Sequence, residues 1–384
     1  MSGFPALGML LDICPFRPHP LVRGGHWQTI VGNYLPGGRA PVAKLHQVSL
    51  SDGDRLALHE DGTFPATVDA AADSSSVNDV AILIHGLAGS HSSAYMLRCS
   101  TKLRQRGITV IRMDLRGCGA GLTLARQPLH AGRSEDAAAV VQYVRKLRPQ
   151  AHIHLVGFSM GANIALKLAG ELRHSGPLQL ASVMGICPPI DLALCTQAIQ
   201  RGFNRIYDRR FARALVRQIA VRNALVPDAL TRPLQPLPAR LLDFDSMFTA
   251  PLGGFADVHD YYARASCGPV LNQIRVPALI IAAASDPIVP VAAFERTSFS
   301  PTTEVHIAPC GGHMGFVAAR GGDPDCRWID WRIVDWVLSR SQHSAALNRT
   351  PQVAPAWPAW STRPSLSGAF ERSKGGIQPS CGLI

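Results

Sequence analysis

The strongest constraint on the fold is a regular alternation of short apolar runs with longer amphipathic stretches, which extends from residue 80 almost to residue 340. The apolar runs predict strands at 80–84, 108–113, 153–156, 181–186, 278–283 and 304–307, preceded by two antiparallel strands at 45–50 and 55–59. The stretches between them predict helices at 93–106, 134–147, 160–174, 258–264 and 328–339. Alternating strands and helices predict an α/β fold with a mostly parallel, doubly wound sheet.

The same pattern divides the chain into parts. We expect an N-terminal arm at 1–43 and a core in two parts, at 44–191 and 241–340. A helical lid at 192–240 is expected between the two parts of the core, and a disordered tail at 341–384. The lid is expected to be helical because the segment has no strand signal and its apolar residues follow a helical spacing. The tail is expected to be disordered because it mixes Pro, Ser, Trp and Gly without periodicity.

The net charge of +11 comes mostly from the expected lid. Residues 201–240 contain nine Arg against Asp208 and Asp228, a surplus of seven, and residues 341–384 add a surplus of three, so the rest of the chain is close to neutral. A nucleic-acid-binding protein would need a basic face on its main body, and the charge pattern therefore argues against nucleic acid as a partner. Five of these arginines recur every four residues, at Arg201, Arg205, Arg209, Arg213 and Arg217. Such a stripe is either a solvated helix face or a contact with an anionic surface, such as a membrane with acidic phospholipids.

The sequence has only weak signals for a membrane span, for secretion and for metal binding. The longest apolar stretches are shorter than the roughly 18 residues of a membrane span, and the candidate at 4–14 lacks a basic leader, so we expect a cytoplasmic protein, with peripheral membrane contact at most. The nine Cys are scattered without a C-x-x-C pair. This argues against a disulfide framework and against a zinc site.

A nucleophile is predicted at Ser159. The run GFSMG at 157–161 follows the expected strand at 153–156 and precedes a helix, which is the context of a nucleophile elbow. Glycines two residues on either side allow a serine to sit on a sharp strand-to-helix turn. A plain strand-helix turn is the alternative interpretation, and the G-x-S-x-G pattern alone does not exclude it.

The partners of Ser159 should follow in the order acid, then histidine. His313 lies in the run CGGHMG between the last expected strand and the last helix. Asp286 follows the strand at 278–283 directly and is the preferred acid, although it could instead be a turn or helix-capping residue. Asp191, one strand earlier, is the alternative acid.

The expected oxyanion hole combines two backbone amides. Met160 begins the helix after the nucleophile, and Leu87 lies in the run HGLAG after the first core strand. We further expect four apolar residues of the lid to line an acyl pocket, with the arginine stripe facing outwards: Phe203, Ile206, Leu215 and Ile219. Nothing in this constellation implies a metal ion or an organic cofactor.

The sequence resembles the YheT-like branch of the α/β-hydrolase superfamily over about residues 15–339. The most specific matching pieces are GHWQTI at 25–30 and the pattern from Asp243 through Asp245 and Thr249 to Tyr262, with further matches at 85–90, 114–119, 286–287 and 311–313. The resemblance implies triad roles for Ser159, Asp286 and His313, and carboxylic-ester hydrolysis, with alcohol acyl transfer or lipid substrates in some members. The sequence departs from the family at Asp114, Ala88 and Ser285.

Together these patterns predict a serine esterase that acts on small-molecule or lipid-like esters through an acyl-enzyme on Ser159. Two alternatives stay open. An acyltransferase would use the same acyl-enzyme with an alcohol in place of water. A catalytically silent binding protein would keep the fold without turnover.

Overall fold

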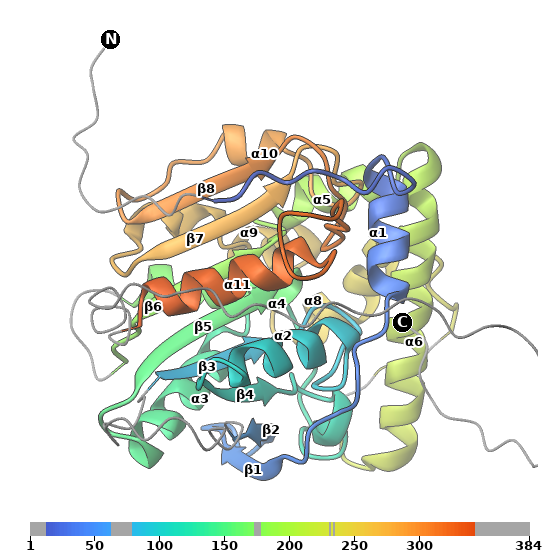
Figure 1. Cartoon of the computed structure of the whole chain (residues 1–384). Coiled ribbons are helices and arrows are strands. Elements are labelled where there is room, and N and C mark those ends of the chain that lie inside the picture. The colour runs from blue at the N-terminus through green and yellow to red at the C-terminus, as the bar shows by residue number, and fades with distance from the viewer. Residues whose placement is uncertain (1–12, 63–78, 173–177, 230–231, 233–234, 342–384) are drawn as a thin grey trace, which may run out of the picture.

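The computed structural model describes residues 13–62, 79–172, 178–229, 232 and 235–341. Its centre is one eight-stranded sheet (Figure 1). The strands are β1 (Lys44–Ser49), β2 (Arg55–Asp61), β3 (Asp79–Ile84), β4 (Thr109–Met113), β5 (His152–Phe158), β6 (Ser182–Ile186), β7 (Ala278–Ala283) and β8 (Thr303–Ala308). All eight correspond to strands predicted from the sequence. Of the expected tail at 341–384, only Ser341, which is buried, lies within the described residues.

The strand order is β1-β2-β4-β3-β5-β6-β7-β8. The β1–β2 and β2–β4 pairs are antiparallel, and every other pair is parallel. Strands β3, β6 and β7 are buried at every position, as expected for parallel strands covered on both faces. The parallel arrangement brings the carboxyl ends of β3, β5, β6, β7 and β8 to one edge of the sheet, where ligands bind in open α/β folds.

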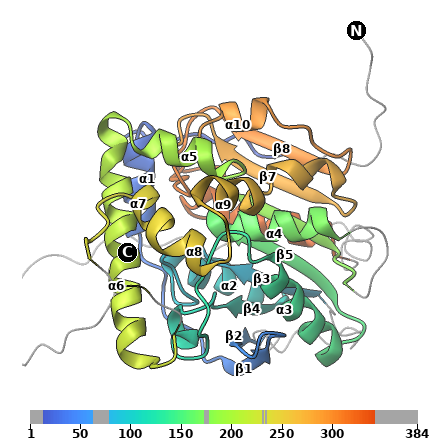
Figure 2. The same ribbon diagram turned by 180° about the vertical axis from the view of Figure 1, so that it is seen from behind.

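Helices cover both faces of the sheet. They are α1 (Gly25–Tyr34), α2 (Ala94–Arg104), α3 (Ser134–Leu147), α4 (Met160–Glu171), α5 (Leu192–Ile199), α6 (Arg205–Leu225), α7 (Leu241–Phe244), α8 (Ala250–Leu252), α9 (Val258–Ala265), α10 (Ala292–Glu295) and α11 (Trp328–Ser339). Helices α2 and α11 pack on one face (Figure 1), and α3, α4 and α9 lie on the other (Figure 2). This confirms the predicted doubly wound α/β architecture.

The segment between β6 and β7 is helical throughout its regular part, and its longest helix is α6. Helix α6 stands across the carboxyl edge of the sheet, at the right of Figure 1. Its inner face buries Tyr207, Ala212, Leu215 and Ile219. The five arginines at 201, 205, 209, 213 and 217 are exposed. Within the described part of the chain, no helix has both the length and the apolar character needed to cross a membrane.

The described part of the N-terminal arm contains a helix that the sequence analysis did not predict. Helix α1 buries two polar side chains, Gln28 and Thr29. The Gln28 amide donates to the carbonyl oxygens of Val22 and Val317 at 2.5 and 3.1 Å, and its oxygen accepts from the Val317 amide at 2.7 Å. A buried glutamine with three hydrogen bonds therefore fastens α1 to the loop that follows β8.

We predict that Gln28→Ala lowers the free energy of unfolding by about 2 kcal/mol, because it leaves the buried amide of Val317 without its acceptor. Urea denaturation measures this change. The matched control is Gln142→Ala, which removes an exposed glutamine from α3 and should change stability by less than about 0.5 kcal/mol. Equal effects of the two substitutions would contradict the anchoring role of Gln28.

Candidate active site

Ser159 occupies the sharp turn between β5 and α4. Its backbone has φ 52° and ψ −118°, a conformation that costs free energy for a residue with a side chain. The Ser159 amide donates to the Ile186 carbonyl at 2.8 Å, which ties the turn to the neighbouring strand. A Cβ at Gly157 would overlap the backbone of Gly161, and a Cβ at Gly161 would overlap the carbonyl of Ile84. The glycines are thus required by close backbone packing at the turn.

The three residues predicted as nucleophile, base and acid form one hydrogen-bonded chain. Ser159 Oγ lies 2.7 Å from His313 Nε2, and His313 Nδ1 lies 2.9 Å from Asp286 Oδ2. Asp286 is buried, and its other oxygen accepts from the amides of Ile288 and Val289 at 2.8 and 3.0 Å. These bonds fix the carboxylate, which in turn orients the imidazole toward Ser159.

Asp191 has a different place. It is exposed and caps the N-terminus of α5, where its carboxylate accepts from the Leu194 amide at 2.9 Å. Helix capping, which the sequence left open as an alternative role for Asp286, is thus the role of Asp191. The structure therefore brings Asp286, not Asp191, to His313.

Helix α1 holds the backbone of residues 310–315, the loop that carries His313 and is called the histidine loop below. The amide of His313 donates to Thr29 Oγ1 at 2.8 Å, and that hydroxyl donates to the Gly25 carbonyl at 2.7 Å. The contact is so close that a Cβ at Gly312 would overlap Thr29 and a Cβ at Gly315 would overlap the carbonyl of Gln28. The sequence alone does not predict this support, although the run GHWQTI at 25–30 is one of its most specific matches to the YheT-like branch.

The two residues whose amides are expected to bind an oxyanion both line the cavity beside Ser159. Leu87 and Met160 line it together with Ser159. Within the described residues, neither amide donates a hydrogen bond to a protein acceptor. The loop is brought close by Gly86, where a Cβ would lie 3.1 Å from Ser159 Cβ. The geometry leaves both amides available for developing negative charge.

A buried carboxylate, Asp114, forms hydrogen bonds to the loop after β3, which carries Leu87. Asp114 accepts from the backbone amide and the Nδ1 of His91, both at 2.7 Å, and from His59 Nε2 at 3.2 Å. Burial alone would raise the pKa of Asp114, but the hydrogen bonds from His59 and His91 outweigh it and hold that pKa well below its usual range. Asp114 thus remains ionised and connects the loop after β3 to the loop after β4.

Two groups of side chains have the composition of a metal site. The first, Cys187 with Asp286 and His313, includes two members of the catalytic chain, and burial raises the pKa of the Cys187 thiol. The second is His59, His91 and Asp114. Its imidazoles stack with centroids 3.5 Å apart, and His59 Nε2 and His91 Nδ1 both contact Asp114 Oδ2, at 3.2 and 2.7 Å. In both groups the imidazole nitrogens are therefore engaged in hydrogen bonds to a carboxylate of the protein.

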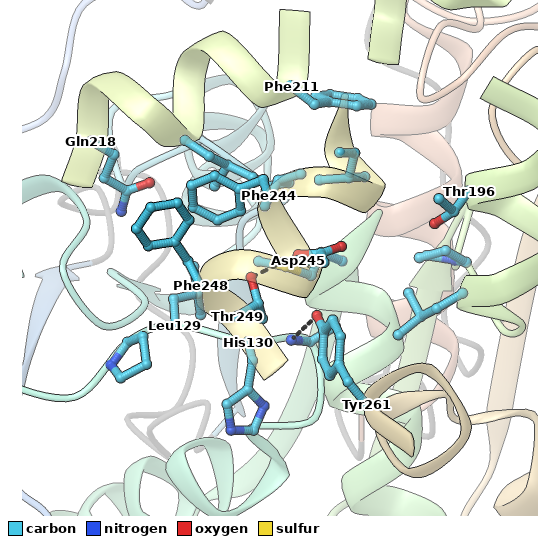
Figure 3. A pocket seen from close by; sticks show the side chains of 18 of the residues that line it. Leu129, His130, Thr196, Phe211, Gln218, Phe244, Asp245, Phe248, Thr249 and Tyr261 are labelled. Atoms are coloured by element: carbon cyan, nitrogen blue, oxygen red, sulfur yellow. Dashed lines mark hydrogen bonds between the residues drawn. The ribbon is translucent and has the colours of Figure 1, made fainter. Parts of the chain in front are cut away.

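A cavity of about 1070 Å³, including its mouth, opens beside Ser159. Figure 3 shows Phe211 and Gln218 of α6, with Phe244 and Phe248 below the helix, around this space. Leu215 and Ile219, two of the four lid residues expected in an acyl pocket, line it. The cavity also contains His130, and because burial lowers the pKa of His130 to about 2, that side chain stays neutral.

The other two expected pocket residues lie elsewhere, and this is a correction. Ile206 is 51% exposed and Phe203 is 64% exposed, and neither borders the cavity. Ile206 is nine residues, or two and a half turns, before Leu215, so the two lie on opposite faces of α6. Phe203 precedes the helix, and its ring packs edge-on against His26 with centroids 4.9 Å apart.

We predict that Asp286→Asn lowers ester turnover by roughly 10⁴-fold, because an amide cannot hold the His313 tautomer that accepts a proton from Ser159. The control is Asp191→Asn, which changes an exposed cap of α5 and should stay close to wild type. Steady-state turnover of one ester by both variants makes the comparison. A greater loss in Asp191→Asn would place the acid one strand earlier.

The chain is similar to known hydrolases. The family model described as "alpha/beta hydrolase fold" matches residues 80–319. The Escherichia coli (strain K12) protein YheT, which is named as an esterase, is 30% identical over 67% of this chain and 76% of its own length. Phospholipase ABHD3 of Mus musculus is 23% identical over 88% of this chain and 83% of its own. The structure of 2,6-dihydroxy-pseudo-oxynicotine hydrolase matches with a TM-score of 0.51 at 15% identity, covering 88% of this chain and 76% of that one. The chain therefore belongs to the α/β-hydrolase family, on its YheT-like branch.

Proposed function

We propose that this protein is a serine hydrolase that cleaves carboxylic esters through an acyl-enzyme on Ser159. The observation that carries the proposal is the hydrogen-bonded chain from Ser159 through His313 to Asp286, with distances of 2.7 and 2.9 Å. The relatives named as an esterase and a phospholipase support a hydrolase of this class.

The reaction has two matched halves. Ser159 Oγ attacks the ester carbonyl carbon while His313 Nε2 takes the hydroxyl proton, and the amides of Leu87 and Met160 stabilise the oxyanion. The bond to the alcohol oxygen then breaks as His313 returns its proton to that oxygen. Water repeats the sequence on the acyl-enzyme, releasing the carboxylic acid and restoring Ser159. Asp286 orients the imidazole throughout, and the chemistry needs no cofactor.

The cavity favours an apolar substrate. Most of its lining is apolar, and Phe211, Leu215, Phe244 and Phe248 contribute aromatic and aliphatic carbon to the wall of the cavity that contains Ser159. Burial of each methylene of an acyl chain in such a site contributes about 0.8 kcal/mol. We therefore propose short- to medium-chain acyl esters or lipid-like esters as substrates.

Two alternatives use the same fold. An acyltransferase would release the acyl group to an alcohol, and product analysis with added alcohol distinguishes it from a hydrolase. A silent binding protein would not react with a fluorophosphonate, which labels an activated serine. The short distance between Ser159 Oγ and His313 Nε2 favours a reactive serine over this second alternative.

The outer surface of the lid supports a peripheral contact with an anionic membrane. Among the described residues, none of the arginines at 201, 205, 209, 213 and 217 forms an ion pair. Four large apolar side chains are also exposed in this region, on α1, in the turn before α6 and at the start of α6: Trp27, Tyr34, Phe203 and Ile206. The guanidinium of Arg210 lies 6.0 Å from the Tyr34 ring centroid, so the two helices adjoin. Unpaired cations with exposed aromatic rings are typical of surfaces that bind acidic lipid headgroups.

We predict that Ser159→Ala abolishes ester turnover, by on the order of 10⁶-fold, because a catalytic triad acts as a unit. A fluorophosphonate probe should label the wild-type protein and not the variant. Circular dichroism of Ser159→Ala checks that the fold is intact. Wild-type turnover by the folded variant would refute the proposal.

We predict that the protein binds vesicles containing anionic phospholipid at low salt, and that 0.5 M salt weakens this binding because it screens exposed charges. Changing Arg205, Arg209 and Arg213 together to Gln should weaken it by roughly 100-fold, at about 1 kcal/mol per charge. The control changes Arg106, Arg275 and Arg296, which are also exposed, to Gln and has the same net charge. If the wild type ignores anionic vesicles at low salt, the lid arginines are only a solvated face.

A further inference from the structure

A small polar network interrupts the apolar wall of the cavity. Asp245 and Thr249 belong to a π-helical turn, Asp245–Thr249, and Tyr262 belongs to α9. Thr249 Oγ1 donates to Asp245 Oδ1 at 2.7 Å, and the Tyr262 hydroxyl donates to Asp245 Oδ2 at 2.8 Å. All three residues line the cavity that contains Ser159. Figure 3 shows Asp245 and Thr249 joined in this way, among Phe244, Thr196 and Tyr261.

The carboxylate of Asp245 has acceptor capacity left over. It is buried, and it forms no ion pair within the described residues. A carboxylate offers about four acceptor positions, and the two hydroxyl donors occupy two of them. Burial raises the pKa of Asp245 to about 6, although the hydrogen bonds from Thr249 and Tyr262 act to lower it. A further donor from a ligand would lower the cost of burying this group.

The local backbone singles out the same residues. A π-helical turn is uncommon, and such turns are frequently found at functional sites. Asp243, two residues before this turn in α7, instead forms an ion pair with Arg240 at 2.7 Å on the surface. Asp245, Thr249 and Tyr262 are also part of the specific pattern in the sequence that the triad does not explain.

We propose that Asp245, supported by Thr249 and Tyr262, is a specificity-determining residue that accepts a hydrogen bond from a hydroxyl group of the ester substrate. This inference rests on the proposed ester hydrolysis at Ser159 and names its substrate class as hydroxylated esters. A neutral donor fits better than an ammonium group, because most of the cavity wall is apolar and would desolvate a cation. A substrate carboxylate at this position would be repelled by Asp245.

The hydroxyl could belong to the acyl chain or to the alcohol, so the experiment has two arms. One uses p-nitrophenyl octanoates with a hydroxyl group placed at successive carbons, and the other uses octanoate monoesters of diols against those of simple alcohols. In one arm, at one position, the hydroxylated ester should have a kcat/KM at least 10-fold above that of its unsubstituted counterpart. A site built around a substrate hydroxyl discriminates strongly against analogues without it.

The variants assign that preference to Asp245. Asp245→Leu has a similar volume and no acceptor, so it should lose the preference: its kcat/KM for the hydroxylated ester should fall to that for the unsubstituted ester. The matched control, Asp243→Asn, should keep the preference. Thermal melting and fluorophosphonate labelling check that Asp245→Leu is folded and has a reactive serine. Should it not fold, Asp245→Ala, which also lacks an acceptor, takes its place with the same expected loss.

The outcomes separate this inference from the proposed function. A wild-type enzyme that hydrolyses plain esters with no hydroxyl preference at any position overturns the inference and leaves the esterase intact. A preference that survives in the folded Asp245 variant also overturns it and assigns the network a structural role. A wild type that neither labels nor turns over any ester refutes the proposed function, and the inference with it.

Discussion

The contact between α1 and the histidine loop is the interaction on which the catalytic arrangement depends. The backbones of the two segments approach so closely that only glycine fits at Gly312 and Gly315. Thr29 then bonds the His313 amide, and Gln28 bonds both backbone groups of Val317. The loop itself has strained backbone, with φ 58° at Met314. A helix outside the sheet thus supplies the rigidity that keeps His313 within reach of Ser159.

Much of the core was predictable because its signals are local. A strand buried on both faces is an unbroken apolar run, so the bounds of β7 could be read from the sequence, and the elbow at Ser159 follows from its glycines. Helix α1 was not predicted because the side chains it buries, Gln28 and Thr29, are polar and give no apolar periodicity. The placement of Ile206 failed because the rotation of α6 about its axis is set by tertiary packing, which an apolar residue type does not reveal.

Two buried carboxyl groups show how environment determines charge in this protein. Asp114 meets two imidazoles and two backbone amides, and these donors keep it ionised in spite of burial. Asp245 meets two neutral hydroxyls in an apolar cavity, and burial prevails, so its pKa rises to about 6. The first arrangement is self-contained and supports a loop. In the second, two acceptor positions of the carboxylate are not filled by the described residues, and a donor from a ligand can fill one of them.

The cavity wall and the reacting groups come from different parts of the chain. Ser159, Asp286 and His313 follow three separate strands of the sheet, but most of the side chains that enclose the cavity come from one continuous stretch, residues 192–262. Chemistry and selectivity are therefore encoded separately. Recombination or point substitution within that single stretch can exchange one substrate range for another without disturbing the bonds among the three catalytic side chains, so relatives that share this sheet are free to diverge in what they bind.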